Sequence, residues 1–97
     1  MRLIVFFDLP AITLEGRKAA ARFRRFLIKQ GFVMLQCSVY MRTVHNSEES
    51  EKYVAKIESG RPKEGDVRCL KISEFQYSSI YSSDETAIPG MEELVEI

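Results

Sequence analysis

The spacing of hydrophobic and polar positions changes along the chain between strand-like and helix-like patterns, and it predicts a short series of strands and helices. Leu3–Phe7 is an unbroken apolar run, which is typical of a strand buried on both faces. Asp8 ends the run, and Pro10 stops the strand because proline has no backbone N–H to donate. The strand therefore holds one carboxylate at the rim of a sheet. Such a position suits a metal ligand, and it equally suits an aspartate that only hydrogen-bonds a turn.

Helical periodicity follows between Leu14 and Lys29, with Thr13 or Asp8 as the N-cap and Gly31 after the last turn. Apolar residues share one face of this helix: Ala19, Ala20, Phe23, Phe26 and Leu27. Four cations form a narrow line well away from that face, here called the basic stripe: Lys18, Arg22, Arg25 and Lys29. Arg17 and Arg24 fall on a third line. Because the cations lack acidic partners four positions away, the pattern favours phosphate contact over a salt-bridged surface.

The segment Phe32–Arg42 has strong strand composition but is long for a single strand. Its only polar interruption is Gln36–Ser38, which suits a bulge or a tight reversal. The pattern alone leaves one bent strand and a hairpin equally open. Cys37 in this segment and Cys69 further along have strand-like surroundings and no CxxC spacing, so we expect both to be small buried hydrophobes.

A second helix is predicted at about Glu48–Glu58, capped by Asn46 or Ser47, and a strand is predicted at Val67–Ile72. After Glu74 the pattern is less regular and is consistent with a short strand or turn followed by another strand. If the middle segment is a hairpin, the order is βαββαβ. This is the ferredoxin-like α+β plan, with two helices on one face of an antiparallel sheet. A second subunit would then cover an apolar open face.

Length and composition predict one globular domain. Apolar residues make up 45% of the 97 residues and charged residues 29%, which is ordinary for a soluble protein. The longest apolar run is far too short to span a bilayer, and the chain opens on a strand rather than on a signal peptide, so we expect a cytoplasmic protein that does not bind membranes. We expect residues 1–81 to form the ferredoxin-like domain and residues 82–97 to form an acidic tail that a partner could order.

The net charge of zero hides a division of the charge along the chain. Residues 1–45 carry eight Lys or Arg and two Asp or Glu, a difference of +6, whereas residues 46–97 carry six and twelve, a difference of −6. Such asymmetry suits a polyanionic partner for the basic half, or pairing of unlike halves between subunits, or a surface that becomes mixed on folding.

Motifs in three places occur together in one order and spacing over residues 1–81. They are Phe7–Pro10 at the end of the first strand, Arg17-Lys18 through Phe23–Leu27 in the basic helix, and Gly31–Tyr40 with its Gln-x-Ser-Val-Tyr core. With these motifs the chain resembles the small CRISPR-associated endoribonuclease subunit that partners the CRISPR integrase in spacer acquisition. It is most similar to the subgroup from systems with a single large effector nuclease.

The resemblance implies a ferredoxin-like homodimer in which the Asp8 carboxylates of two subunits face each other, with an extra C-terminal strand added to the partner's sheet. It also implies that Gln36–Ser38 joins the second and third strands. One Mg²⁺ between the two carboxylates would polarise a phosphodiester and help to generate hydroxide. Asp8 is thus the expected catalytic residue and metal ligand. The expected nucleic-acid-binding residues are Arg17, Lys18, Arg22, Arg25 and Lys29.

Two functions follow from these expectations. The first is a subunit that docks the CRISPR integrase and supports duplex DNA on its basic surface. The second is a free-standing Mg²⁺-dependent nuclease that cleaves RNA or DNA through Asp8, and a toxin-like RNA-binding dimer is a further alternative. The sequence shows no second acidic cluster near Asp8 and no obvious general base. The first function, docking the integrase and supporting DNA, therefore requires fewer functional groups than the nuclease does.

Overall fold

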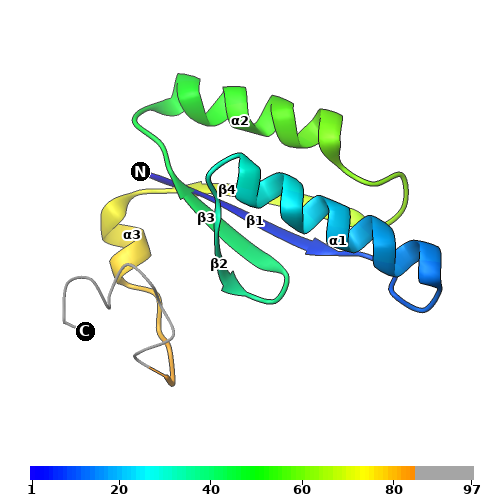
Figure 1. The fold of residues 1–97 in the computed structure, drawn as a ribbon. Helices are drawn as coiled ribbons and strands as arrows, with labels where there is room; N and C mark the ends of the chain where they lie inside the picture. Colours follow the sequence, from blue (N-terminus) through cyan, green and yellow to red (C-terminus); the bar gives the residue numbers. More distant parts are fainter. Residues whose placement is uncertain (85–97) are drawn as a thin grey trace.

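The computed structural model describes residues 1–84 of the chain. A four-stranded antiparallel sheet has the strand order β2-β3-β1-β4 (Figure 1). The elements follow the chain as β1 (Arg2–Asp8), α1 (Leu14–Lys29), β2 (Val33–Gln36), β3 (Val39–Thr43), α2 (Ser47–Gly60), β4 (Asp66–Ile72) and α3 (Glu74–Ser78). This arrangement confirms the ferredoxin-like α+β plan.

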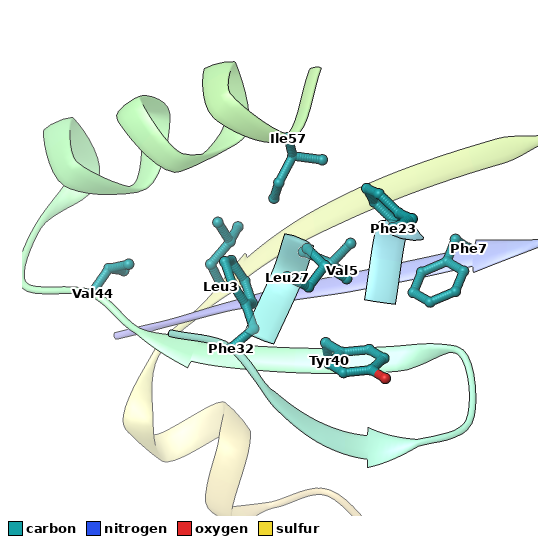
Figure 2. Close-up of a cluster of buried hydrophobic side chains, with 9 residues drawn as sticks. All are labelled: Leu3, Val5, Phe7, Phe23, Leu27, Phe32, Tyr40, Val44 and Ile57. Atoms are coloured by element: carbon teal, nitrogen blue, oxygen red, sulfur yellow. The ribbon is translucent and has the colours of Figure 1, made fainter. Parts of the chain in front are cut away.

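Helices α1 and α2 lie on one face of the sheet, and the main core fills the space between the helices and the sheet (Figures 1 and 2). Because side chains alternate along a strand, Leu3, Val5 and Phe7 of β1 all point into this core. The Phe7 ring meets Phe23 of α1 edge-on at 5.1 Å and stacks on Tyr40 of β3 at 5.9 Å between centroids. The end of β1 is therefore anchored to a helix and to a neighbouring strand.

Ile4, Phe6 and Asp8 of β1 point to the opposite side of the sheet, here called the second face. Helix α3 covers one end of it, where Tyr77 packs with Ile4 and Met41. The other end is open, and Phe6 is 37% exposed there. The continuous apolar run of β1 thus reflects a strand with partners on both sides over most of its length.

Glu74 ties α3 to the start of β1. The Arg2 guanidinium donates to both Glu74 carboxylate oxygens at 3.0–3.1 Å and stacks on the Tyr77 ring at 4.1 Å. The Met1 ammonium lies 3.3 Å from the same carboxylate. Hydrogen bonds from Arg2, and secondarily from the Met1 ammonium, hold the pKa of Glu74 below its ordinary value.

The sequence left a short strand or a turn open after Glu74, whereas Glu74–Ser78 is a helix. Ser73 accepts from the Gln76 amide while the Gln76 side chain accepts from the Ser73 amide, which is a capping box. No strand follows α3 within residues 1–84. The remainder of the acidic tail, residues 85–97, and any extra strand within it lie outside the described residues, so these expectations stay predictions.

The segment Phe32–Arg42 is a hairpin, with a register shift between Met34 and Gln36. Ser38 in its turn accepts a hydrogen bond from the Phe7 amide at 3.1 Å, which fixes the turn beside the end of β1. The expectation that Cys37 is buried is wrong, because the turn exposes it. Cys69 on β4 is half-buried, and burial raises the pKa of its thiol.

The two long helices confirm their predicted caps. Thr13 accepts from the Gly16 amide at the start of α1, and Asn46 accepts from the Glu49 amide at the start of α2. Gly31 follows α1 with φ of 91°, a conformation that favours glycine. Within residues 1–84, no helix combines the length and the apolar composition that crossing a membrane requires.

Candidate nucleic-acid interface and acidic rim

Asp8 stands at the end of β1, as the sequence predicts, and its side chain is exposed on the second face. The backbone on both sides of it is held: β1 pairs with β4 as far as Asp8, and the Phe7 amide bonds to Ser38. Gly65 has φ of 98°, and a Cβ there would come within 2.8 Å of the Asp8 carbonyl oxygen. The loop before β4 therefore packs directly against the backbone of Asp8.

Asp66, the first residue of β4, is paired in register with Asp8. Directly opposed residues of antiparallel strands have Cβ atoms about 4.5–5.5 Å apart, so the two carboxylates share one end of the sheet, here called the acidic rim. The sequence shows no second acidic cluster near Asp8, and Asp66 was not predicted as its partner. It could have been found, because the ferredoxin-like strand order pairs the start of the last strand with the end of the first.

The acidic rim opens onto a hollow of about 320 Å³ on the second face. Its lining residues are Phe6, Phe7, Asp8, Ser38, Val39, Asp66 and Arg68. The Nε atom of Arg68 donates to an Asp66 carboxylate oxygen at 2.7 Å, whereas Asp8 has no ion pair within residues 1–84. No three His, Cys, Asp or Glu side chains of that part of the chain are grouped so as to hold a metal ion. Among the described residues, the hollow thus offers the Asp8 carboxylate without an ion pair beside the Asp66 carboxylate, which Arg68 pairs.

The basic stripe lies along the exposed side of α1, and all four of its cations are exposed. None of the four forms an ion pair with any other described residue. Ala20, Phe23 and Leu27 are buried on the other side of the helix, as predicted. The stripe is a row of exposed positive charges that faces away from the sheet and has no ion pair among residues 1–84.

Arg17 is exposed, but it differs from the residues of the stripe. Its Nη1 atom donates to the carbonyl oxygens of Ala11 at 3.3 Å and of Ile12 at 3.1 Å, so it also holds the loop that leads into α1. The structure therefore brings the four residues of the stripe together on one line. It places Asp8 on the second face, across the sheet from the helix that carries the stripe.

A larger cleft of about 630 Å³ lies between α1 and the loop from α2 to β4. Cations and acids both line it, among them Arg22 and Lys63 beside Glu15 and Glu64. Because the charges are mixed, this cleft has no clear preference for an anion. Its size alone does not make it the better candidate site.

These features define a ferredoxin-like α+β protein with a carboxylate at the rim of its sheet and a row of exposed cations along its first helix. A family model described as "CRISPR associated protein Cas2" matches residues 1–80, and the chain belongs to this family. The family confirms the resemblance seen in the sequence motifs.

Relatives of this chain are named "CRISPR-associated endoribonuclease Cas2". The protein from Treponema denticola is 48% identical over 80 residues, which cover 82% of this chain and 79% of that protein. The protein from Acidovorax ebreus is 40% identical over 80 residues, covering 82% and 78%. The protein from Streptococcus mutans is 38% identical over 86 residues, covering 88% and 79%. The names of these relatives make the family one of nucleases.

Proposed function

We propose that this chain is a homodimeric subunit of CRISPR adaptation that docks integrase subunits and binds the backbone of duplex DNA during spacer acquisition. Asp8 in addition forms a Mg²⁺-dependent site that cleaves phosphodiester bonds. The observation that carries the proposal is the basic stripe, whose four exposed cations have no acidic partner among residues 1–84.

The geometry of the stripe suits a phosphate backbone. Lys18 and Lys29 are eleven residues apart, so the stripe extends over about 16 Å at the helical rise of about 1.5 Å per residue. Duplex DNA carries about one negative charge per 1.7 Å of its axis, so a row of this length meets several phosphates. Contacts of this kind fix position and do not read base sequence. This is what a subunit that supports any new spacer requires.

The open end of the second face supports the homodimer. Phe6 is 37% exposed there. Leu70 and Val33 lie on the same face in the row of Ile4 and Met41, and they are 53% and 50% exposed. A second copy that covers these apolar side chains would remove them from water. Because Asp8 projects from the same face, such a dimer would bring the acidic rims of two subunits toward each other.

The residues of the rim fit a magnesium ion by their chemistry. Mg²⁺ prefers carboxylate oxygens, keeps several of its waters and needs few protein ligands. Asp8 offers a carboxylate with no ion pair among the described residues, and the pairing of β1 with β4 fixes the backbone that carries it. A bound Mg²⁺ would polarise the phosphodiester and lower the pKa of a bound water. Asp8 would hold the ion, and Phe6 would keep one wall of the hollow apolar.

The decisive experiment is the integration of a short duplex into a CRISPR array by purified integrase together with this chain. Arg22→Glu combined with Arg25→Glu should abolish integration, because two attractive phosphate contacts become repulsive. Lys52→Glu combined with Lys56→Glu changes the net charge equally on exposed positions of α2 and should leave integration intact. Asp8→Asn should also leave integration nearly intact. Loss of integration in the control on α2 would show that only net charge matters.

A free-standing metal-dependent ribonuclease is the second candidate, and a toxin-like RNA-binding dimer is a variant of it. The names of the relatives favour this candidate, since they describe endoribonucleases. The same set of proteins separates the two functions. If Asp8→Asn abolishes RNA cleavage while reversal of the stripe leaves integration unchanged, ribonuclease activity is the function and bridging is not.

A further inference from the structure

We propose that Arg68 anchors the substrate phosphate in the Asp8 site and that Asp66 is the positioning residue that holds Arg68 there. This inference rests on the proposed nuclease function of Asp8 and adds to it a residue that binds substrate. It comes from a part of the chain, the start of β4, that the sequence motifs do not include.

The register of the sheet places the three side chains together. Asp66 is opposite Asp8, and Arg68 is opposite Phe6. The three charged side chains and Phe6 therefore all face the same hollow. Arg68 is exposed, and its Nε atom is 2.7 Å from an Asp66 carboxylate oxygen. Since residues two apart on a strand share a face, Asp66 directs the guanidinium along the surface beside Asp8.

Stability of the fold does not account for this arrangement. Like charges directly opposite each other on neighbouring strands are destabilising, so the pairing of Asp8 with Asp66 works against the sheet. The ion pair between Asp66 and Arg68 is well exposed on both sides, and such pairs contribute little. Where local pairing rules are broken without an evident gain in stability, a function is the usual reason.

The chemistry of the hollow fits a phosphodiester. Asp8 and Asp66 both repel an approaching phosphate, and Arg68 supplies a positive charge from the same chain in addition to the proposed Mg²⁺. Its Nε atom is used by Asp66, and its terminal nitrogens make no other hydrogen bond with the described residues. These planar N–H donors match the oxygens of a phosphate. The apolar Phe6 wall excludes some water and so strengthens the contact.

The test measures cleavage of a short fluorescein-labelled single-stranded RNA with Mg²⁺, with kcat and KM determined separately. Arg68→Ala should lower kcat/KM about tenfold or more, mainly through KM, which corresponds to the loss of a charge-assisted phosphate contact. Arg68→Lys should recover part of this loss, because the charge returns without the planar donors. Arg61→Ala is the matched control, since Arg61 is also an exposed arginine with an acidic neighbour, Glu58, at 3.7 Å.

The role of Asp66 is tested by coupling. Asp66→Asn should raise KM by less than Arg68→Ala does, and the double variant should be no worse than Arg68→Ala alone, because Asp66 acts through Arg68. Losses that simply multiply in the double variant would overturn the positioning role. Gel filtration of each variant should show the wild-type oligomeric state. A loss of activity that accompanies a change of oligomeric state would overturn the proposal, because Arg68 would then act through the dimer.

The failure of this inference differs from the failure of the proposed function. If Asp8→Asn abolishes cleavage but Arg68→Ala matches Arg61→Ala within about twofold, Asp8 is catalytic and the Arg68 inference is wrong. If Asp8→Asn cleaves like the wild type, the proposed catalytic site fails. The Arg68 contact is then judged by direct binding of the same RNA, where unchanged affinity of Arg68→Ala overturns it as well.

Discussion

The acidic rim and the basic stripe are both exposed and both charged, but the backbone holds them in different ways. Asp8 is at the end of a strand that pairs on both sides, with Gly65 packed against its carbonyl oxygen. The cations of the stripe stand on long side chains that touch nothing acidic within residues 1–84. The backbone fixes the position of the rim carboxylate, whereas the stripe acts through the total charge of several flexible side chains.

This difference determines how each region responds to substitution. A site of fixed geometry loses its function when one atom changes or moves. A row of flexible cations loses affinity gradually, one phosphate contact at a time, and its losses depend on salt. Because the sheet lies between the two regions, a change in one should leave the other unaffected. The predictions that follow test this separation.

Asp8→Asn should give the largest effect on cleavage. We expect the rate to fall at least about a hundredfold, because even groups that only support a metal ligand are worth up to that much. Binding of duplex DNA should stay within about twofold of the wild type, since additive behaviour is expected for distant sites. Gel-based cleavage of labelled RNA and fluorescence anisotropy with a labelled duplex measure the two effects. Loss of duplex binding in this variant would contradict the separation.

Gly65→Ala should damage the rim without changing any of its functional groups. The new Cβ would meet the Asp8 carbonyl oxygen at 2.8 Å and a Leu9 methyl at 2.6 Å, in a conformation with φ of 98° that side chains rarely adopt. We expect a loss of about 1–3 kcal/mol in the free energy of unfolding, measured in urea, together with slower RNA cleavage. Glu64→Ala, at the exposed neighbouring position, is the control and should change neither quantity.

Arg22→Ala combined with Arg25→Ala should leave cleavage by the rim unchanged and weaken duplex binding. A plot of log K against log salt has a negative slope, and each lost phosphate contact should make it shallower by about 0.9. The double variant should therefore make it shallower by about 2. Anisotropy titrations over a range of salt concentrations measure the slope. Lys52→Ala combined with Lys56→Ala removes the same charge from α2 and should leave the slope as it is. An equal drop in both double variants would contradict a localised stripe.

The basic stripe could be predicted from the sequence because it depends on local signals. The apolar spacing of α1 and its Thr13 cap depend on residues within a few positions of one another, so the helix and its stripe were predicted with their observed bounds. The Asp66 partner of Asp8 depends on strand register, which joins residues far apart in the chain. The sequence could not decide between a hairpin and one bent strand at Phe32–Arg42. Gln36–Ser38 lacks the glycine or asparagine of a typical tight turn.

Helix α3 was missed because Phe75 and Tyr77 alternate with polar residues over a segment too short to show a helical period. Its capping box was visible in the sequence as Ser73 and Gln76, three positions apart. What no local pattern predicts is the Glu74 contact with Arg2, which joins α3 to the start of β1. This contact holds α3 on the covered part of the second face, and its loss should give the smallest effect.

Glu74→Gln should destabilise the covered part of the second face only above the acid range. Hydrogen bonds from Arg2 hold the pKa of Glu74 in the folded chain below its ordinary value of 4.5, so the charged carboxylate stabilises the fold above that value. The contribution is lost as the pH falls through the lowered pKa, where wild type and variant become alike. Since the pair is partly exposed, the difference near neutral pH should be at most about 1 kcal/mol. Thermal unfolding by circular dichroism measures it, and a difference that persists at the acid end would mean that Glu74 acts through packing instead of charge.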